Sequence, residues 1–283
     1  MMMDMENLLA TIVERLKVVP GIAGIVLGGS RATGTHTAES DVDIGIYYDA
    51  AEPLDIAALS VVATELDDSR REELVTPIGG WGPWINGGGW LRIGGMAVDL
   101  LYRELDKVTV VAMDCRQGSL SVHYQPGHPH AFCSPIYMGE AAACRILWDP
   151  EGRIEQLKSL CTPYPDALQK AVADTFMWEA GFSIANAHKG VKRGDVSYVA
   201  GHLFRTVSCM TQVLFALNRT YMLNEKGAVA ACAGFPISPV DFAERIHRSY
   251  SQLSPERTVL ASAVDEMDAL VQETERLKAE CLR

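Results

Sequence analysis

The stretch IAGIVLGGSRATGTHTAESDVDIGI, residues 22–46, decides the fold that the sequence predicts. Its apolar start, Ile22 to Leu27, is typical of a buried strand, and two glycines and a serine then open a tight turn. The backbone N–H groups of such a turn can face an anion. We expect Ser30 to be the N-cap of a short helix, whose N-terminus also favours phosphate. The stretch therefore predicts a strand, a phosphate-binding turn and a returning strand.

Two acidic residues, Asp41 and Asp43, stand two positions apart at the start of the returning strand. Because side chains alternate along a strand, both carboxylates are expected on one face, with Val42 and Ile44 on the other. Like charges held side by side repel each other unless something neutralises them. Mg²⁺ does so, since it binds a few carboxylates together with substrate phosphates. The pair therefore predicts a metal site beside the phosphate-binding turn.

Gly29-Ser30 followed by Asp41-x-Asp43 on a strand resembles the signature of the nucleotidyltransferase superfamily with the DNA polymerase β-type palm. Members of that family usually carry a third carboxylate on a later strand, and Asp99 is the candidate here. An aspartate inside so apolar a segment is costly without a partner, and a shared metal would supply one. The alternative is a solvated hairpin that happens to carry two acids, which leaves the match at three places unexplained.

The resemblance implies transfer of a nucleoside monophosphate, expected to be AMP from ATP or another nucleoside triphosphate, to an acceptor hydroxyl. Two Mg²⁺ ions would bridge Asp41, Asp43 and the phosphates, and Asp99 would hold the second ion. Asp99, or a glutamate of the helical domain, would remove the acceptor proton. Gly29 and Ser30 would orient the β- and γ-phosphates.

Three further side chains are candidates for phosphate contact, and each has an alternative role. Ser40 bonds a phosphate or its own backbone, and Arg31 faces the triphosphate or solvent. Tyr221–Gly227 resembles an Asn-Glu-Lys stretch in the helical domains of antibiotic adenylyltransferase-like proteins. On that resemblance Lys226 contacts the triphosphate; otherwise it begins a helix capped by Asn224.

The chain is expected to be α+β, with a mixed-sheet palm and its helices over residues 1–149 and an all-helical bundle over 150–283. Gly94-Gly95 predicts a two-residue hairpin turn between strands at 91–93 and 96–102. Strand signals end near Trp148. Helices are expected at 4–19, 53–68, 105–117, 135–148, 154–160, 165–192, 196–218, 225–233, 239–250 and 255–282.

Two loops carry unusual side chains. Residues 77–90 combine tryptophans with many glycines and prolines. These tryptophans either form an aromatic wall for a base or an acceptor ring or, as we favour, cap the sheet edge. Residues 123–133 gather His123, His128, His130 and Cys133. A zinc site would need a second ligand pair, so contact with the acceptor or with the domain junction is preferred.

Composition bears on partners and compartment. The net charge of the 283 residues is −11, and no cluster of lysine and arginine is visible, which argues against a nucleic-acid acceptor. We expect a neutral or cationic small molecule, bound between the domains. Seven scattered cysteines, no basic leader in residues 1–10 and no apolar membrane span indicate a cytoplasmic protein. No oligomeric state follows from the sequence.

The order of domains resembles aminoglycoside and lincosamide nucleotidyltransferases, which implies an antibiotic-like acceptor. A protein adenylyltransferase or a toxin–antitoxin-type nucleotidyltransferase is the second candidate. The candidate that is not an enzyme is a nucleotide-binding regulator, against which the three carboxylates count.

Overall fold

The computed structural model describes residues 4–283; residues 1–3, part of the segment in which no leader is expected, lie outside it. The chain forms two compact units. The first, here called the sheet unit, contains the chain as far as Met113, with His123–Gly127 and Tyr137–Pro163. The second, here called the helical unit, contains Asp114–Val122, His128–Ile136 and Tyr164–Arg283. None of the helices within residues 4–283 combines the length and apolar character needed to cross a bilayer.

The sheet unit is built on a five-stranded sheet in the order β3-β4-β2-β1-β7. β2 and β4 run parallel, whereas the other neighbours are antiparallel, so the sheet is mixed and the predicted α+β fold is confirmed. The strands are β1 (Ile22–Leu27), β2 (Val42–Tyr48), β3 (Gly88–Ile93), β4 (Met96–Glu104) and β7 (Arg145–Trp148). The helices are α1 (Met5–Leu16), α2 (Gly29–Thr33), α3 (Ile56–Leu66), most of α4 (Leu105–Arg116) and of α5 (Pro135–Ala143), and α6 (Arg153–Cys161).

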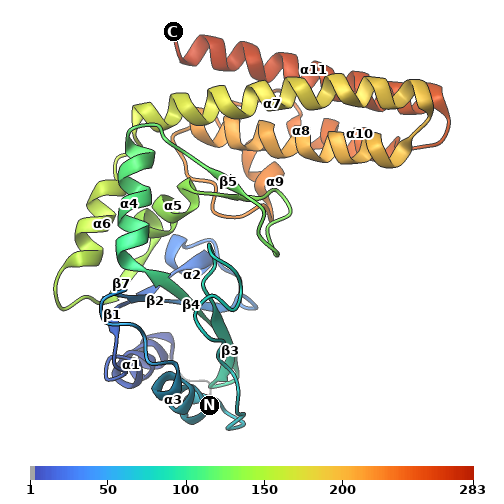
Figure 1. Cartoon of the computed structure of the whole chain (residues 1–283). Helices are drawn as coiled ribbons and strands as arrows, with labels where there is room; N and C mark the ends of the chain where they lie inside the picture. The colour runs from blue at the N-terminus through green and yellow to red at the C-terminus, as the bar shows by residue number, and fades with distance from the viewer. Residues whose placement is uncertain (1–3) are drawn as a thin grey trace. The chain divides into compact units, whose positions relative to one another are not determined.

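One face of this sheet carries the core of the unit. Along β4, Val98, Leu100 and Tyr102 are fully buried, while the residues between them are more exposed. α1 and α3 lie beneath this face in Figure 1 and contribute Leu8, Ile12 and Leu59 to the same core, among others. Because strand side chains alternate, the residues between the buried ones point to the opposite face. That opposite face carries the polar positions of β2 and β4.

The hairpin between β3 and β4 turns at Gly94 and Gly95, as predicted. Their φ angles are +59° and +81°, and Ile93 pairs with Met96 across the turn. Two positive φ angles define the turn type that matches the strand twist, and glycine adopts them without strain. The carboxylate of Asp68 accepts both turn N–H groups, each at 2.8 Å. The hairpin tip is therefore fastened to the segment that follows α3.

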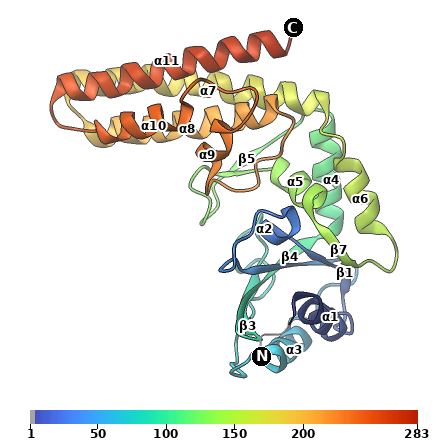
Figure 2. The ribbon, with the colours of Figure 1, turned by 180° about the vertical axis from the view of Figure 1, so that it is seen from behind.

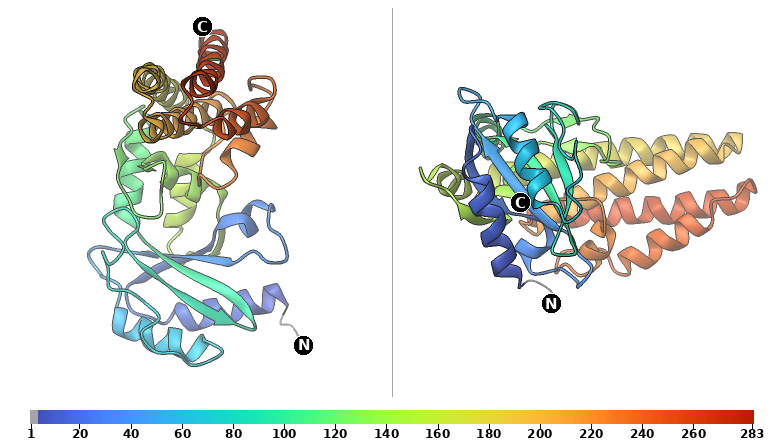
Figure 3. Two further views of the ribbon diagram at one scale, coloured as in Figure 1. Left: turned by 90° about the vertical axis from the view of Figure 1, so that its right-hand side faces the viewer. Right: turned by 90° about the horizontal axis from the view of Figure 1, so that it is seen from below.

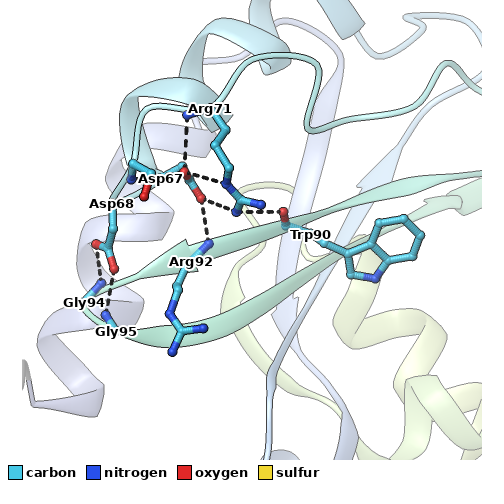
Figure 4. Close-up of polar contacts among 8 residues, drawn as sticks. Asp67, Asp68, Arg71, Trp90, Arg92, Gly94 and Gly95 are labelled. Atoms are coloured by element: carbon cyan, nitrogen blue, oxygen red, sulfur yellow. Dashed lines mark hydrogen bonds and ion pairs between the residues drawn. The ribbon is translucent and has the colours of Figure 1, made fainter.

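A second carboxylate, that of Asp67, fastens the body of β3 (Figure 4). It accepts the N–H of Arg92 at 2.8 Å and forms an ion pair with Arg71, with Nη2 to Oδ1 at 2.6 Å. The hydrogen bonds from Arg71 hold the pKa of the buried Asp67 well below its usual range. A buried carboxylate with this many donors is stable as the anion. It holds the edge strand in a fixed position.

The helical unit consists mainly of long helices packed side by side. Its elements are α7 (Asp166–Arg193), α8 (Val196–Leu217), α9 (Ala228–Ala233), α10 (Phe242–Ser251) and α11 (Arg257–Cys281). α7, α8 and α11 run alongside one another in Figures 1 and 2, and the left view of Figure 3 shows them nearly end-on. A further two-stranded sheet pairs β5 (Val122–His123) with β6 (Phe132–Cys133). The predicted helical C-terminal part is confirmed.

Several expected helix bounds are wrong by three residues or more, and two of them show the physical reason. The helix expected over 135–148 ends at Ala143, and Arg145–Trp148 forms β7, which pairs with β1. A short apolar run has no periodicity that separates strand from helix, so pairing with an open sheet edge decides its structure. The helix expected from Glu225 begins at Ala228, because Gly227 has φ +77° and the chain is not helical there.

Candidate active site

The candidate site lies on the face of the sheet opposite the core, where β2 and β4 run side by side. Asp43 and Asp99 are direct partners in the register of these parallel strands. Val42 and Ile44 are fully buried, whereas Asp43 and Asp99 are half-buried, so both aspartates occupy the face opposite the core. Neighbouring strands lie about 4.8 Å apart. The fold therefore brings together two carboxylates that are far apart in the sequence.

The third predicted carboxylate, Asp41, is exposed and comes directly before β2. Burial raises the pKa of Asp99 to about 6, and the negative charges of Asp41 and Asp43 contribute to the rise. A carboxylate resists ionisation when its neighbours are already negative. The three side chains thus share one electrostatic environment.

The glycine turn lies against Asp43. The N–H of Gly28 donates to the backbone carbonyl of Asp43 at 2.8 Å, and a Cβ added at Gly29 would collide with the Asp43 carboxylate. Gly29 also has φ +60°, which favours glycine. The expectation that Ser30 caps the helix is wrong: Gly28 is the N-cap, and Ser30 is the second residue of α2. The helix starts earlier because the close approach to Asp43 sets where the backbone turns.

Arg31 has a role that the sequence did not reveal. Its Nη2 and Nε donate to the carbonyl of Ser40 at 2.6 and 3.1 Å, and Nε also donates to the carbonyl of Asp41 at 3.0 Å. Ser40 Oγ accepts the N–H of Thr37 at 2.9 Å, within its own loop. Arg31 therefore ties α2 to the segment that leads into the acidic strand. No sequence pattern marks an arginine that bonds carbonyls nine and ten residues away.

Replacing Arg31 with alanine is expected to weaken Mg²⁺-dependent binding of a nucleoside triphosphate about 10-fold, because the backbone of Asp41 loses its anchor. Titration calorimetry of ATP in the presence of Mg²⁺ would measure this. Arg31→Lys keeps one donor and should give an intermediate value. Unchanged binding in Arg31→Ala would mean that the anchor does not position Asp41.

The three aspartates suit a divalent cation that shares its ligands with a phosphate. Among residues 4–283, no three His, Cys, Asp or Glu side chains are already gathered closely enough to hold a metal ion. Carboxylate oxygens are nonetheless the ligands that Mg²⁺ prefers, and Mg²⁺ usually keeps waters and substrate phosphates in its remaining positions. A cation would also relieve the repulsion that contributes to the raised pKa of Asp99. The donor set therefore fits an open site rather than a closed protein cage.

Lys226 belongs to the helical unit, as do two of the histidines of the 123–133 loop, His128 and His130. Lys226 is exposed, and its N–H donates to Asn224 Oδ1 at 2.7 Å, but Asn224 does not cap a helix, because α9 begins at Ala228 with Gly227 as its N-cap. The neighbouring Glu225 accepts the N–H of His130 at 3.2 Å, and its Oε1 lies 3.3 Å from His128 Nδ1. Within the helical unit these histidines contact Glu225. His123 instead belongs to the sheet unit and stacks on Trp84, with ring centroids 4.0 Å apart.

Two parts of the chain match known protein families. Residues 6–82 match the family model of the nucleotidyltransferase domain, which includes the glycine turn, Asp41 and Asp43. Residues 136–226 match a second family model, described as a domain of unknown function, DUF4037. The comparison with curated proteins found no match. Asp99 lies beyond the first matched range, so it joins the site through the register of β2 and β4.

The comparison with solved structures found, among others, a nucleotidyltransferase-like protein from Exiguobacterium sibiricum. It is 12% identical in sequence with a TM-score of 0.47, over 99% of this chain and 78% of that chain. Residues 6–82 thus match a nucleotidyltransferase domain, which supports the resemblance to the nucleotidyltransferase superfamily and indicates a nucleotidyltransferase enzyme.

Proposed function

We propose that the protein transfers a nucleoside monophosphate, AMP from ATP, to a hydroxyl of a small molecule in a Mg²⁺-dependent reaction. One observation carries this proposal: Asp43 and Asp99 pair in register on neighbouring strands, and the glycine turn lies directly against Asp43. The arrangement sets a phosphate-binding element beside a group of carboxylates. That is what transfer from a triphosphate requires.

In the proposed reaction, the acceptor oxygen forms a bond to the α-phosphorus as the bond from that phosphorus to the bridging oxygen of the β-phosphate breaks. Pyrophosphate leaves, and the acceptor proton passes to Asp99. Mg²⁺ held by Asp41, Asp43 and Asp99 would supply charge neutralisation on the phosphate oxygens. N–H groups of the first turn of α2, at Gly29 and Ser30, would hold the outer phosphates, because they have no partner within the helix.

The charge of the protein supports the proposed class of acceptor. A net charge of −11 disfavours a polyanionic nucleic acid and favours a neutral or cationic molecule. Hydroxylated cationic antibiotics of the aminoglycoside type, and lincosamides, are the first acceptors to test.

The test is pyrophosphate release from each of the four common nucleoside triphosphates with Mg²⁺ and a panel of aminoglycosides, lincosamides and proteins. We expect release that depends on Mg²⁺ and on a small-molecule acceptor, which gains the mass of one nucleoside monophosphate. Labelled protein instead would identify a protein adenylyltransferase. Triphosphate binding without turnover would identify a regulator.

A further inference from the structure

A tryptophan continues the row of aspartates across the sheet. Trp90 on β3 is the direct register partner of Asp99 on β4, and Asp99 is in turn the partner of Asp43 on β2. Leu91 and Ile93 are buried in the core, whereas Trp90 is 59% exposed. Alternation along the strand therefore places the indole on the same face as the carboxylates. Asp43, Asp99 and Trp90 form one line over three adjacent strands.

A second tryptophan supports the first. The ring centroids of Trp81 and Trp90 are 4.6 Å apart, with 31° between their planes. A Cβ added at Gly88 would lie 2.8 Å from Trp81 Cζ3, so glycine there leaves room for the ring over β3. Offset aromatic pairs of this kind stabilise each other. Together the two indoles form what we call the tryptophan shelf.

The loop that carries Trp81 is held in place within the sheet unit. Gln125 Nε2 donates to the carbonyl of Trp81 at 2.6 Å, and Tyr137 Oη donates to the carbonyl of Trp84 at 2.6 Å. Asn86 Nδ2 donates to Tyr48 Oη at 2.7 Å in the interior. A fixed loop means that the shelf does not have to be ordered when a ligand binds.

Exposure of Trp90 is unexpected for a residue that only caps a sheet edge. Its strand is already fastened by Asp67 and Arg71, and in Figure 4 the ring extends away from that network. A large indole left more than half in water contributes little to the core. What sets Trp90 apart from other exposed aromatic side chains is its place directly beside the Asp99 carboxylate.

The position of the shelf within the row suggests what it binds. The glycine turn contacts Asp43, on the β1 side of the row, whereas Trp90 adjoins Asp99, on the β3 side. If phosphates bind at the turn and Asp99 receives the acceptor proton, the acceptor approaches from the β3 side. We propose that the acceptor places the apolar face of a ring on Trp90, supported by Trp81, and is thus a hydroxylated molecule whose ring, saturated or aromatic, presents such a face. The direction from which the acceptor approaches is inferred from the proposed function, so this inference rests on it.

The test compares Trp90→Ala and Trp90→Phe with the wild type. Binding of aminoglycosides and lincosamides is measured by calorimetry and by tryptophan fluorescence, with glycerol as an acceptor that lacks a ring. Loss of the stacking surface should weaken binding of a ring-bearing probe about 10-fold or more in Trp90→Ala. Trp90→Phe keeps an aromatic face and should remain within about 3-fold of the wild type. Binding of ATP with Mg²⁺ should be unchanged in both.

Trp178→Ala is the matched control, because Trp178 is also exposed, at 71%, and stacks on Phe182 with ring centroids 5.5 Å apart. The control should bind the probes as the wild type does.

Three results would each overturn the shelf as an acceptor site. The first is equal probe binding by wild type and Trp90→Ala, and the second is failure of every ring-bearing probe to bind the wild type. The third is a loss of ATP binding in Trp90→Ala as large as its loss of probe binding. Pyrophosphate release that persists unchanged in Trp90→Ala would leave the proposed function standing without the shelf. Probe binding that depends on Trp90, with no turnover of any acceptor, would sink the proposed function but not the shelf as a ring-binding site.

Discussion

Replacing Asp43 with asparagine is expected to lower the rate of Mg²⁺-dependent nucleotidyl transfer by about 1,000-fold or more. Asparagine has nearly the same shape, so the contact with Gly29 and the register with Asp99 are retained. The amide is neutral, however, and a much weaker ligand for a hard cation. A 1,000-fold loss corresponds to about 4 kcal/mol of transition-state stabilisation, which is within the range that metal ions supply. Asp41→Asn should act in the same direction.

Initial rates of pyrophosphate release would measure the effect, with thermal unfolding as a check that the variants are folded. Asp265→Asn is a matched control, since Asp265 is exposed on α11 in the helical unit. It should retain wild-type activity. Full activity in Asp43→Asn would remove the metal assignment altogether.

The sequence predicts the carboxylates well because each signal is local. Apolar residues flank Asp43 in one segment and Asp99 in another, and the glycine turn fixes the start of the first. What the local pattern does not contain is the parallel register between β2 and β4, which sets Asp99 opposite Asp43. That register depends on the shared core beneath both strands rather than on any turn between them.

Contacts between distant segments account for what the sequence did not predict. Arg31 bonds carbonyls across a loop, and β7 is a strand only because the edge of β1 is available to it. Gly88 and Gly89 are typical of a loop, yet they lie in β3. There a Cβ at Gly88 would collide with the carbonyl of Leu100, and one at Gly89 would lie 2.5 Å from that of Leu74. Close packing selects glycine at these strand positions, so the start of β3 and the placement of Trp90 in it were missed.

Replacing Asp99 with asparagine should have opposite effects on activity and on stability. Transfer should fall by about 1,000-fold, because the variant loses both a metal ligand and the proposed base. Without divalent cations at pH 7, the melting temperature should instead rise by about 2–4 °C, or roughly 1 kcal/mol. The fold holds the Asp99 carboxylate partly buried beside Asp41 and Asp43, and the neutral amide relieves that cost.

The difference in melting temperature between wild type and Asp99→Asn should depend on pH, because the fold raises the pKa of Asp99. The folded pKa of Asp99 is about 6, above its ordinary value of 3.8, so the folded state binds the proton more tightly than the unfolded state between these values. The charged Asp99 carboxylate therefore lowers the free energy of unfolding of the wild type by its full amount above about pH 6. As the pH falls from 6 toward 4 the penalty disappears, and the melting temperatures of wild type and Asp99→Asn should converge.

Mg²⁺ provides the complementary measurement, because it neutralises the same charges. Millimolar Mg²⁺ at pH 7 should raise the melting temperature of the wild type more than that of Asp99→Asn, since a ligand stabilises the state that binds it. The higher melting temperature of Asp99→Asn relative to the wild type should then become smaller or reverse. A variant that is less stable than the wild type at pH 7 without Mg²⁺ would contradict the assignment, since Asp99 would then be a structural carboxylate with a favourable partner. A metal ligand of this kind lowers the stability of the folded protein at neutral pH, and the bound cation restores that stability. A carboxylate that serves only the fold stabilises it without a cation.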